Sequence, residues 1–578
     1  MQLVDSTLPI NQALARLKSP STGGPSTDQW IAYEVDDATY KVHRRELSRM
    51  VMMGLDEVPV CAISTPEDIG LTNAEDDLAQ VSHDFSRRLT AYFPVSFVAA
   101  LYELQSLMNR AEISGYVIGG MPRDLLRFEE KRLKVTDVDI TVEGDAIELS
   151  RFLVENSRNF TIVDAFPEFG TAKLLYKETL MMDLASTREE VYPHCGAMPV
   201  VLHTGVPLKE DVIRRDFTIN ALALSIQPLG QVIDYTQGLE DLRLRQIRIL
   251  HPASFFEDPS RILRLLKFCA RFDFHPELST QELMLRFIQF GGMCYKGGGD
   301  RIKQELKGFL SAPESDTKSK WIAYFIRNRL YRLINMELEE LAILGLQEEA
   351  DSPVSLEARL KNVTTYLPEI LDTLSTYIDS LENTSFEVYL CFLFRQWPSD
   401  SFQKAMLRLG LTRQERDCIE EFRANGINLV ERLNSLHELS PPAEIYELFR
   451  GTPLSTTIAC LLQVSLRAPS HMRTVLEALM RYKRKWKNLR LELDGNDLIN
   501  LGVPEGKEVG RFLKELLHIK LAGQLPDRAA EINAVRRILQ IDPGHSETQK
   551  GSTAPRSENE LYEWEKGAWP DVAPPSSH

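Results

Sequence analysis

The chain has 578 residues, of which 43% are apolar and 26% are charged, and this balance is typical of a globular protein with several domains. No run of about 18 or more apolar residues occurs, so the sequence predicts no membrane-spanning helix. The seven cysteines include no CxxC pair, which argues against zinc sites and disulfide frameworks. With no signal-peptide pattern at the start, we expect a cytoplasmic protein. The net charge of −16 argues mildly against a nucleic-acid partner unless positive residues cluster locally.

Residues 1–85 are predicted to form a small α/β unit. The alternation WIAYEV at 30–35 predicts a strand, and VHRRELSRMVMMGL at 42–55 predicts a helix. The order of strand, basic turn and helix resembles a single CBS repeat. That resemblance implies adenine-nucleotide binding or a dimer contact.

Residues 86–228 show an α/β pattern and are predicted to form one domain. FVAALYELQSLMNRAEI at 97–113 predicts a helix, and GYVIGG at 115–120 predicts a buried strand that ends in a turn. Further strands are predicted at DVDITV, AKLLY, LMMDLAS and LALSI, which lie at 137–142, 172–176, 180–186 and 222–226.

Helical patterns dominate after residue 250. They predict a helical neck at 229–345 and a helical, RNA-binding body and tail at 346–542, followed by a disordered Pro/Ser/Gly/Glu-rich segment at 543–578. The basic segments 318–332 and 481–490 are candidate RNA contacts, the second with Tyr482 and Trp486 interleaved. A solvated helix face explains the segment at 481–490 equally well.

A glycine turn follows the strand at 115–118. It reads Gly119-Gly120-Met121-Pro122-Arg123-Asp124, and proline suits the first turn of the helix that it opens. Paired glycines permit close backbone approach to a ligand, and an arginine there can bind phosphate oxygens. The turn is neither a Walker A loop nor a GxGxxG fingerprint. An ordinary turn between strand and helix is the alternative.

Two carboxylates, Asp137 and Asp139, lie in the strand that follows. Alternate side chains of a strand share a face, so both carboxylates point the same way. Close carboxylates repel unless a cation intervenes, and magnesium prefers such hard oxygen ligands together with substrate phosphates. Two solvated aspartates on an exposed strand are the alternative. A phosphate-binding turn followed by DxD is the layout expected for two-metal phosphoryl chemistry.

Together these motifs resemble the head of the tRNA nucleotidyltransferase (CCA-adding enzyme) and bacterial poly(A) polymerase family, which begins GGxxRD and continues to DxD. Later motifs follow in the family's order: DLASTR at 183–188, EDVIRRDFTINAL at 210–222, EDPSRILR at 257–264, GDRIKQEL at 299–306 and LDGNDLINLGVPEGKEVGRFL at 493–513. The resemblance covers residues 90–310 strongly and 310–540 loosely. It implies a polymerase-β-type α/β nucleotidyltransferase head followed by a mostly α-helical neck, body and tail.

The resemblance implies that Asp137 and Asp139 are catalytic and hold two Mg²⁺ ions, with Asp183 as a candidate third carboxylate. It also implies that Gly120 and Arg123 bind the triphosphate. The full set expected to bind nucleotide is Gly119, Gly120, Arg123, Asp124, Arg215, Asp216, Asn220, Glu257, Asp258, Arg261 and Arg264. Residues 189–205 match the family's flexible loop, which helps the pocket change between C and A addition.

Two motifs are expected to act on the incoming nucleotide. Arg215 would reach it, while Asp216 and Asn220, four apart on one helix face, would orient Arg215 or the sugar. Asp258 and Arg261, on adjacent helical turns, would present an acceptor and a donor to the base edge. The alternatives are a helix cap with a buried salt bridge for the first motif and an intrahelical salt bridge for the second.

We therefore expect an enzyme that adds CCA, or part of it, to tRNA 3′ ends from CTP and ATP. A poly(A) polymerase is the closest alternative because it shares the same head. A nucleotide-binding regulator with an inactive head and an RNA-binding scaffold are alternatives of another class. The regulator predicts nucleotide binding without pyrophosphate release.

Overall fold

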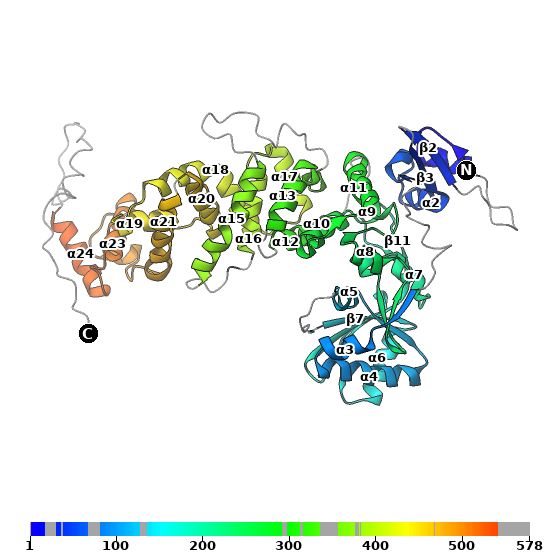
Figure 1. The fold of residues 1–578 in the computed structure, drawn as a ribbon. Coiled ribbons are helices and arrows are strands. Elements are labelled where there is room, and N and C mark those ends of the chain that lie inside the picture. Colours follow the sequence, from blue (N-terminus) through cyan, green and yellow to red (C-terminus); the bar gives the residue numbers. More distant parts are fainter. Residues whose placement is uncertain are drawn as a thin grey trace. The chain divides into compact units, whose positions relative to one another are not determined.

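The computed structural model describes most of the chain (Figure 1). The described residues are 2–17, 30–35, 38–66, 81–127, 135, 137–291, 298–311, 316–335, 356–375, 381, 383–467 and 469–541. The chain divides into a first unit, Met1–Glu438 with Leu448–Lys483, and a second, Leu439–Glu447 with Arg484–His578. The predicted disordered tail at 543–578 lies outside the described residues. None of the described helices is both long enough and apolar enough to cross a membrane.

The N-terminal residues form a small α/β unit, in which the predicted strand and helix are both present. Four strands pair in the order β1-β2-β3-β4, and they are β1 (Gln2–Leu3), β2 (Trp30–Val35), β3 (Ala38–His43) and β4 (Thr65–Pro66). Helix α1 (Ile10–Arg16) packs on α2 (Arg44–Met52). The ring of His43 caps α2 by accepting the N–H of Arg45 at 3.2 Å, and α2 buries the face that carries Glu46, Leu47 and Met50.

The head contains an eight-stranded sheet in the order β5-β14-β13-β6-β7-β10-β9-β8. Its strands are β5 (Val81–Asp84), β6 (Ser114–Ile118), β7 (Asp137–Glu143), β8 (Phe160–Phe166), β9 (Thr171–Tyr176), β10 (Leu180–Ser186), β13 (Ala223–Ile226) and β14 (Leu229–Asp234). Strands β7 and β10 pair in parallel, and the other neighbours in this sheet are antiparallel. Helices α4 (Val95–Ala111) and α6 (Ala146–Asn156) pack on the sheet and on each other. The predicted α/β head is therefore confirmed, and its sheet extends one strand beyond each end of 86–228.

The prediction that residues 189–205 form a loop is wrong, because this segment contains a two-stranded ribbon. Strand β11 (Arg188–Val191) pairs antiparallel with β12 (Val200–Thr204). Four of the five residues of β12 are exposed, so backbone pairing rather than apolar burial holds the ribbon together. Such a strand has no buried face, and the sequence therefore carries no apolar alternation that would reveal it.

The rest of the first unit is predominantly helical, as expected. The helices of the neck are α8 (Gly238–Arg243), α9 (Ser254–Glu257), α10 (Ser260–Phe272), α11 (Leu278–Phe290), α12 (Gly299–Leu310) and α13 (Asp316–Arg327). Beyond them lie α15 (Leu356–Ser375), α16 (Thr384–Phe394), α17 (Ser399–Arg408), α18 (Arg413–Ser435), α20 (Leu454–Arg467) and α21 (Pro469–Arg481). Helix α20 packs against α15, α16, α18 and α21, so it forms the centre of this helical body.

The second unit has a core of its own, built from three helices. They are α22 (Gly495–Asn500), α23 (Lys507–Leu521) and α24 (Arg528–Ile541). Apolar side chains from all three helices are buried together, Leu498, Leu516 and Val535 among them. The fully buried carboxylate of Glu531 accepts the Nζ–H of Lys520 at 2.6 Å and the backbone N–H of Leu493 at 2.9 Å. A buried charge is tolerated only with such partners.

Part of the basic surface expected to meet RNA is buried. Lys318 is 1% exposed, and its ammonium donates to the carbonyl of Leu310 at 2.7 Å and lies over the ring of Tyr389. The aromatic residues of the segment at 481–490, Tyr482 and Trp486, are also buried. These three side chains therefore cannot stack on bases or contact phosphates as the sequence pattern suggested.

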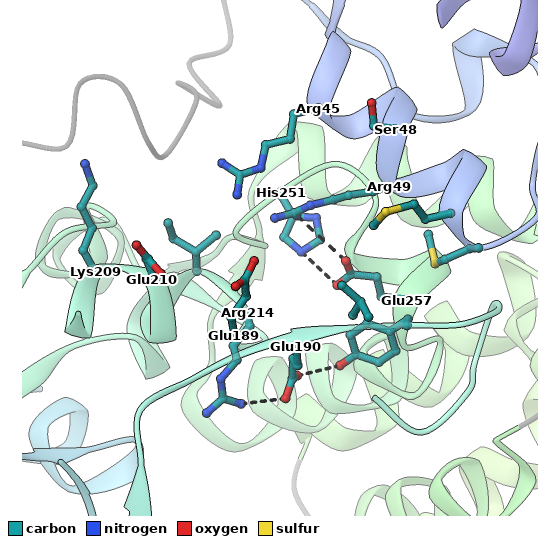
Figure 2. Close-up of a pocket in the computed structure, with 15 residues that line it drawn as sticks. Arg45, Ser48, Arg49, Glu189, Glu190, Lys209, Glu210, Arg214, His251 and Glu257 are labelled. Atoms are coloured by element: carbon teal, nitrogen blue, oxygen red, sulfur yellow. Dashed lines mark hydrogen bonds and ion pairs between the residues drawn. The ribbon is translucent and has the colours of Figure 1, made fainter. Parts of the chain in front are cut away.

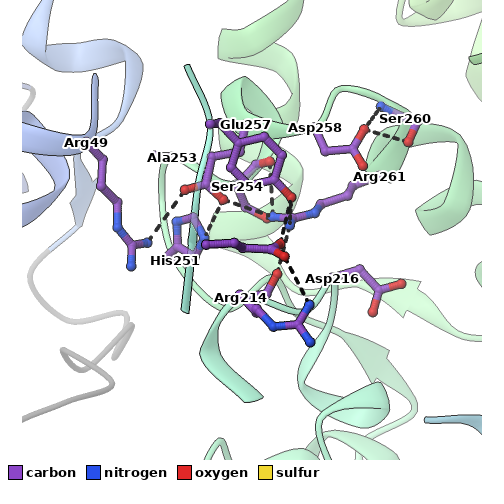
Figure 3. Close-up of polar contacts among 12 residues, drawn as sticks. Arg49, Arg214, Asp216, His251, Ala253, Ser254, Glu257, Asp258, Ser260 and Arg261 are labelled. Carbon is purple, nitrogen blue, oxygen red and sulfur yellow. Dashed lines mark hydrogen bonds and ion pairs between the residues drawn. The ribbon is translucent and has the colours of Figure 1, made fainter. Parts of the chain in front are cut away.

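The N-terminal unit packs against the neck through buried charges (Figure 3). Glu46 on α2 accepts the backbone N–H of Ala253 at 3.3 Å, and its carboxylate lies 3.5 Å from Nδ1 of His251. On α11, Arg286 donates to the carbonyls of Cys61 and Ser64, each at 2.5 Å. Burial acts to raise the pKa of Glu46, but Arg49 and His251 outweigh it and lower that pKa to about 2.

Replacing Gly299 with alanine should destabilise the protein. A Cβ at this first residue of α12 would lie 1.7 Å from the carbonyl oxygen of Arg408, at the end of α17, so the two helices must separate. We expect a loss of roughly 2 kcal/mol or more in the free energy of unfolding, measured by urea denaturation. Gly308→Ala in the same helix is the control, because its Cβ would meet only the flexible Lys267 at 3.5 Å. Equal stabilities of the two variants would contradict the packing described.

The contribution of Glu46 to stability should depend on pH. Its pKa is lowered in the folded state, so the stabilisation is present above the ordinary value of 4.5 and is lost as pH falls through about 2. We expect Glu46→Gln to be less stable than wild type by about 3 kcal/mol at most at pH 7, and this difference should shrink below pH 4.5. Denaturant titrations between pH 3 and 7 measure it. The exposed Glu34→Gln on β2 is the control, and a difference that does not change with pH would refute the assignment.

Candidate active site

Three carboxylates meet where β7 and β10 run side by side. In β7, Asp137 and Asp139 are exposed while the residues between and after them are buried, so the two aspartates share a face as predicted. The register of the parallel pair places Asp139 opposite Asp183 of β10. Lys173 of β9 lies opposite Asp183 on the other side, with its Nζ 3.9 Å from Oδ1 of Asp183. Register therefore brings together carboxylates that are 44 residues apart in the chain.

The charge balance of this cluster favours a cation. Burial and the neighbouring Asp183 raise the pKa of Asp139, and Asp137 adds to this effect, while Arg215 and Lys173 only partly oppose it. Oδ1 of Asp183 is buried without a hydrogen bond. Among the described residues, no three Asp, Glu, His or Cys side chains form a ready-made metal cage. The donor set therefore fits a hard divalent cation, such as Mg²⁺, that takes its remaining ligands from substrate and water.

A cavity of about 600 Å³, called the cleft here, opens beside these carboxylates. Its volume lies in the range of small-molecule sites. The predicted residues that line it are Gly119, Gly120, Arg123, Asp139, Arg215, Asp216, Asn220, Asp258, Arg261 and Arg264. A second cavity of about 410 Å³ contains Asp139, Lys173, Asp183 and Arg215. Three predicted residues, Asp124, Asp137 and Glu257, are not among those that line the cleft.

The glycine turn lies directly against the carboxylates. Gly119 has φ +83°, a conformation that favours glycine, and a Cβ there would lie 3.6 Å from Oδ2 of Asp139. Helix α5 (Gly120–Leu126) begins after it, with Pro122 in its first turn. A side chain at position 119 would therefore strain the backbone, and its Cβ would touch Asp139.

Arg123 is enclosed by other parts of the head and neck. Its side chain is almost completely buried, and it donates to Asp124 at 2.9 Å and to Asn220 at 2.6 Å. The guanidinium also lies 4.7 Å from the ring centroid of Phe272. Asp124 is thus a partner of Arg123, and Arg123 lines the cleft while linking the glycine turn to Asn220.

The motif at 214–220 forms no α-helix, which corrects the expectation that Asp216 and Asn220 share a helix face. Helix α7 (Leu208–Ile213) ends before it, and only a 3₁₀ turn, Thr218–Asn220, follows. The tight turn nevertheless brings the two side chains together, because Asn220 Nδ2 donates to Asp216 Oδ1 at 3.0 Å. Burial raises the pKa of Asp216, but Arg264 and Asn220 outweigh it and hold that pKa below the ordinary value.

A fully buried carboxylate that the sequence analysis missed, Asp211, fixes the two arginines of this motif. It accepts from Arg214 at 2.6 Å and from Arg215 at 3.0 Å. Its spacing of three and four residues from these arginines was the available signal. Asp211 occupies only part of the Arg215 guanidinium, whose Nε is buried without a hydrogen bond, and Arg215 lines the cleft.

Two helices, not one, carry the motif at 257–264. Helix α9 ends at Glu257, Asp258 is extended, and α10 starts at Ser260. Asp258 accepts from Ser260 and from Arg301 at 2.7 Å, so it does not form the intrahelical pair with Arg261 that was considered. Asp258 and Arg261 both line the cleft. No sequence pattern predicted that Arg301 binds Asp258. Arg301 also donates to the carbonyl of Ala197 at 2.6 Å.

Both terminal nitrogens of Arg261 donate to protein acceptors. Nη1 donates to Ser254 Oγ at 2.6 Å, and Nη2 donates to the carbonyl of Arg214 at 2.9 Å and to the hydroxyl of Tyr192 at 3.3 Å. Arg264 is more open, and it joins Asp216 at 2.7 Å to Glu305 at 2.9 Å. Arg261 is thus fixed in place by the fold before any ligand binds.

Glu257, expected to bind nucleotide, lies on the other side of this motif. It lines a third cavity of about 650 Å³ between α2 and the β11–β12 region, called the N-terminal cavity here (Figure 2). His251 Nε2 lies 3.1 Å from its carboxylate. Burial raises the pKa of Glu257, but His251, Arg49 and Arg261 outweigh it and lower that pKa to about 2. Glu257 therefore lies behind Arg261 and does not line the cleft, and its role in nucleotide binding stays a prediction.

Comparison with known proteins bears out the resemblance. Residues 115–248 match the poly A polymerase head domain. The chain is 32% identical over 415 residues to the A-adding tRNA nucleotidyltransferase of Aquifex aeolicus, covering 70% of this chain and 44% of that one. It is 25% identical over 442 residues to the CCA-adding enzyme of Lactobacillus johnsonii, covering 76% and 96%. The chain spans about half the length of the A-adding relatives it matches, 50% for that of Geobacter sulfurreducens.

Solved structures agree. An apo form of a CCA-adding enzyme superposes with a TM-score of 0.62 at 25% identity, covering 80% of this chain and 100% of the other. The Thermotoga maritima CCA-adding enzyme complexed with tRNA gives a TM-score of 0.58 at 25% identity, with the same coverage. Nucleotidyltransferases of this family generally use divalent metal ions. The motifs and the mixed sheet agree with these similarities: residues 115–248 match the poly A polymerase head domain, and the chain is similar over most of its length to tRNA nucleotidyltransferases.

Proposed function

We propose that this protein transfers nucleoside monophosphates from CTP or ATP to the 3′ end of tRNA, adding CCA or part of it, in the cytoplasm. The observation that carries the proposal is the register of Asp139 opposite Asp183 beside an arginine-lined cleft of nucleotide size. Relatives named A-adding and CCA-adding tRNA nucleotidyltransferases support it. So do similar structures described as complexes with ATP, CTP and tRNA.

Asp137 and Asp139, with Asp183, would hold two Mg²⁺ ions. When bound, these ions would lower the pKa of the primer 3′-hydroxyl and offset charge on the triphosphate. Arg215 has a donor left for the nucleotide, because Asp211 occupies only part of its guanidinium. Gly119 and Gly120 would let the triphosphate approach the backbone closely. Arg123 and Asn220 would keep this turn and the Asp216 motif in a fixed relation.

Asp258 and Arg261 would read the edge of the base, with Arg264 beside them. A site built to hydrogen-bond one base discriminates strongly only when its groups are already fixed. Arg261 meets this requirement because Ser254, Tyr192 and the backbone of Arg214 hold its guanidinium. The helical regions at 229–345 and 346–542 would receive the RNA, and the resemblance of residues 1–85 to a CBS repeat stays a prediction.

The reaction is tested with purified protein, magnesium, labelled NTPs and three tRNA transcripts that end before CCA, after C-C, and complete. We expect incorporation that stops on the complete tRNA. Ordered addition of C, C and A identifies a CCA-adding enzyme. Extension of the C-C transcript alone identifies an A-adding enzyme, and addition that stops at C-C identifies a CC-adding enzyme. Long A tails on unrelated RNA identify a poly(A) polymerase, the alternative.

Asp139→Ala should reduce incorporation by roughly a thousandfold or more, since it removes a proposed metal ligand. Asp164→Asn is the matched control, because Asp164 lies exposed on β8 of the same sheet, and it should retain wild-type activity. Nucleotide binding without pyrophosphate release in the wild type would refute the proposal and favour a nucleotide-binding regulator.

Asp183→Asn should change the melting temperature differently with and without metal. In EDTA it removes a charge that raises the pKa of Asp139, so the melting temperature should stay constant or rise. Wild type should gain melting temperature on adding Mn²⁺, because a ligand that binds the folded state stabilises it, and the variant should gain much less. Differential scanning fluorimetry measures both effects, with Asp164→Asn as control. An undiminished response to Mn²⁺ would exclude Asp183 as a metal ligand.

A further inference from the structure

Helix α2 of the N-terminal unit contacts the segment that precedes the cleft arginines. Glu46 accepts the N–H of Ala253, the residue before α9, and also faces His251. Nη1 of Arg49 lies 3.6 Å from the carboxylate of Glu46 and 4.0 Å from that of Glu257. Two side chains of α2 therefore reach both ends of α9, which spans Ser254–Glu257.

The same short helix holds Arg261. Ser254, its first residue, accepts from Nη1 of Arg261 through both Oγ and the backbone carbonyl, at 2.6 and 3.3 Å. Glu257, its last residue, lies 3.5 Å from the same nitrogen. Whatever moves α9 must therefore move the acceptors of the Arg261 guanidinium. Figure 3 shows Arg49, His251, Glu257 and Arg261 in one connected group.

A single layer of side chains separates α2 from the cleft. Glu190, Tyr192 and Arg214 line both the cleft and the N-terminal cavity. Arg49 lines that cavity from the α2 side (Figure 2). Glu190 accepts from Arg214 at 3.3 Å and from the hydroxyl of Tyr192 at 3.2 Å. Tyr192 and the backbone of Arg214 are in turn the remaining acceptors of Arg261.

We infer that Glu46 and Arg49 are positioning residues which, through α9, fix Arg261 and so set how strongly the cleft discriminates between nucleotide bases. This inference rests on the proposed function, because it concerns the arginine proposed to read the base. Glu257 is buried and charged, so it needs its cationic partners. Without Arg49, its partners in this group are His251 and Arg261. The Glu257 carboxylate and the Arg261 guanidinium must then readjust together.

The test compares two substitutions that each weaken the contact between the N-terminal unit and the neck. Arg49→Ala removes a contact that leads to Arg261. Arg286→Ala removes a docking contact of the N-terminal unit that ends on the carbonyls of Cys61 and Ser64. Arg16→Ala, exposed on α1, is the neutral control. Full-length variants are assayed for kcat and KM with ATP, CTP, GTP and UTP, and calorimetry gives the Kd of each nucleotide without RNA.

We expect Arg49→Ala to lower the selectivity for the accepted bases by about tenfold, mainly through KM and Kd, since small displacements of a positioned group have large effects. Arg49→Lys keeps the cation and should retain selectivity within about twofold. Glu46→Gln should fall between the two. Arg286→Ala should lower the melting temperature while leaving selectivity at the wild-type ratio.

Equal selectivity in Arg49→Ala and wild type would overturn the inference, as would an equal loss in Arg286→Ala, because docking alone would then explain the effect. If wild type binds nucleotides but transfers none, the proposed function fails, and the Kd ratios still decide whether Arg49 acts on the cleft. If Arg49→Ala does not fold, Glu46→Gln takes its place beside Arg286→Ala. A wild-type Kd ratio in Glu46→Gln would then overturn the inference.

Discussion

Burying a guanidinium is tolerable only where acceptors surround it, and this constraint determines the shape of the cleft. Asp211 is placed to hold both Arg214 and Arg215, and Asp216 joins the head to α10 through Arg264. Each arginine is thus positioned by a carboxylate, which is local for Arg214 and Arg215 and 48 residues away for Arg264. The cleft can present several fixed positive groups because the fold supplies negative partners behind them, which also explains how a chain of net charge −16 can bind an anion.

The carboxylate cluster differs from the arginines because its charges are not balanced by partners of opposite sign. Asp139 and Asp183 face each other across parallel strands. Burial and the charge of Asp183 raise the pKa of Asp139, and Arg215 and Lys173 do not offset them. The site is therefore less stable alone than with a cation. The sheet imposes this arrangement, since the buried residues that alternate with Asp137 and Asp139 fix which face the carboxylates occupy.

Sequence patterns predicted the strands that have an apolar face, such as β7 and β10, and the helices α2 and α4 that bury one side. They missed the ribbon β11–β12, whose stability comes from backbone pairing. They also could not place Asp183 opposite Asp139, because register between strands far apart in the chain leaves no local signal. The spacing of Asp258 and Arg261 suggested that one helix carries both residues. The chain is instead extended at Asp258, so α9 ends before it and α10 begins after it.

The contacts of α2 with α9 have a thermodynamic consequence. If Arg49 restrains Arg261, the two sites are thermodynamically coupled. Attachment of the N-terminal unit then raises the affinity of the cleft for nucleotide, and a nucleotide that contacts Arg261 strengthens that attachment by the same factor. Nucleotide binding in the cleft would then change the stability of the contact that residues 38–66 make on the opposite side of α9. The N-terminal unit would thus report on the state of the cleft as well as influence it.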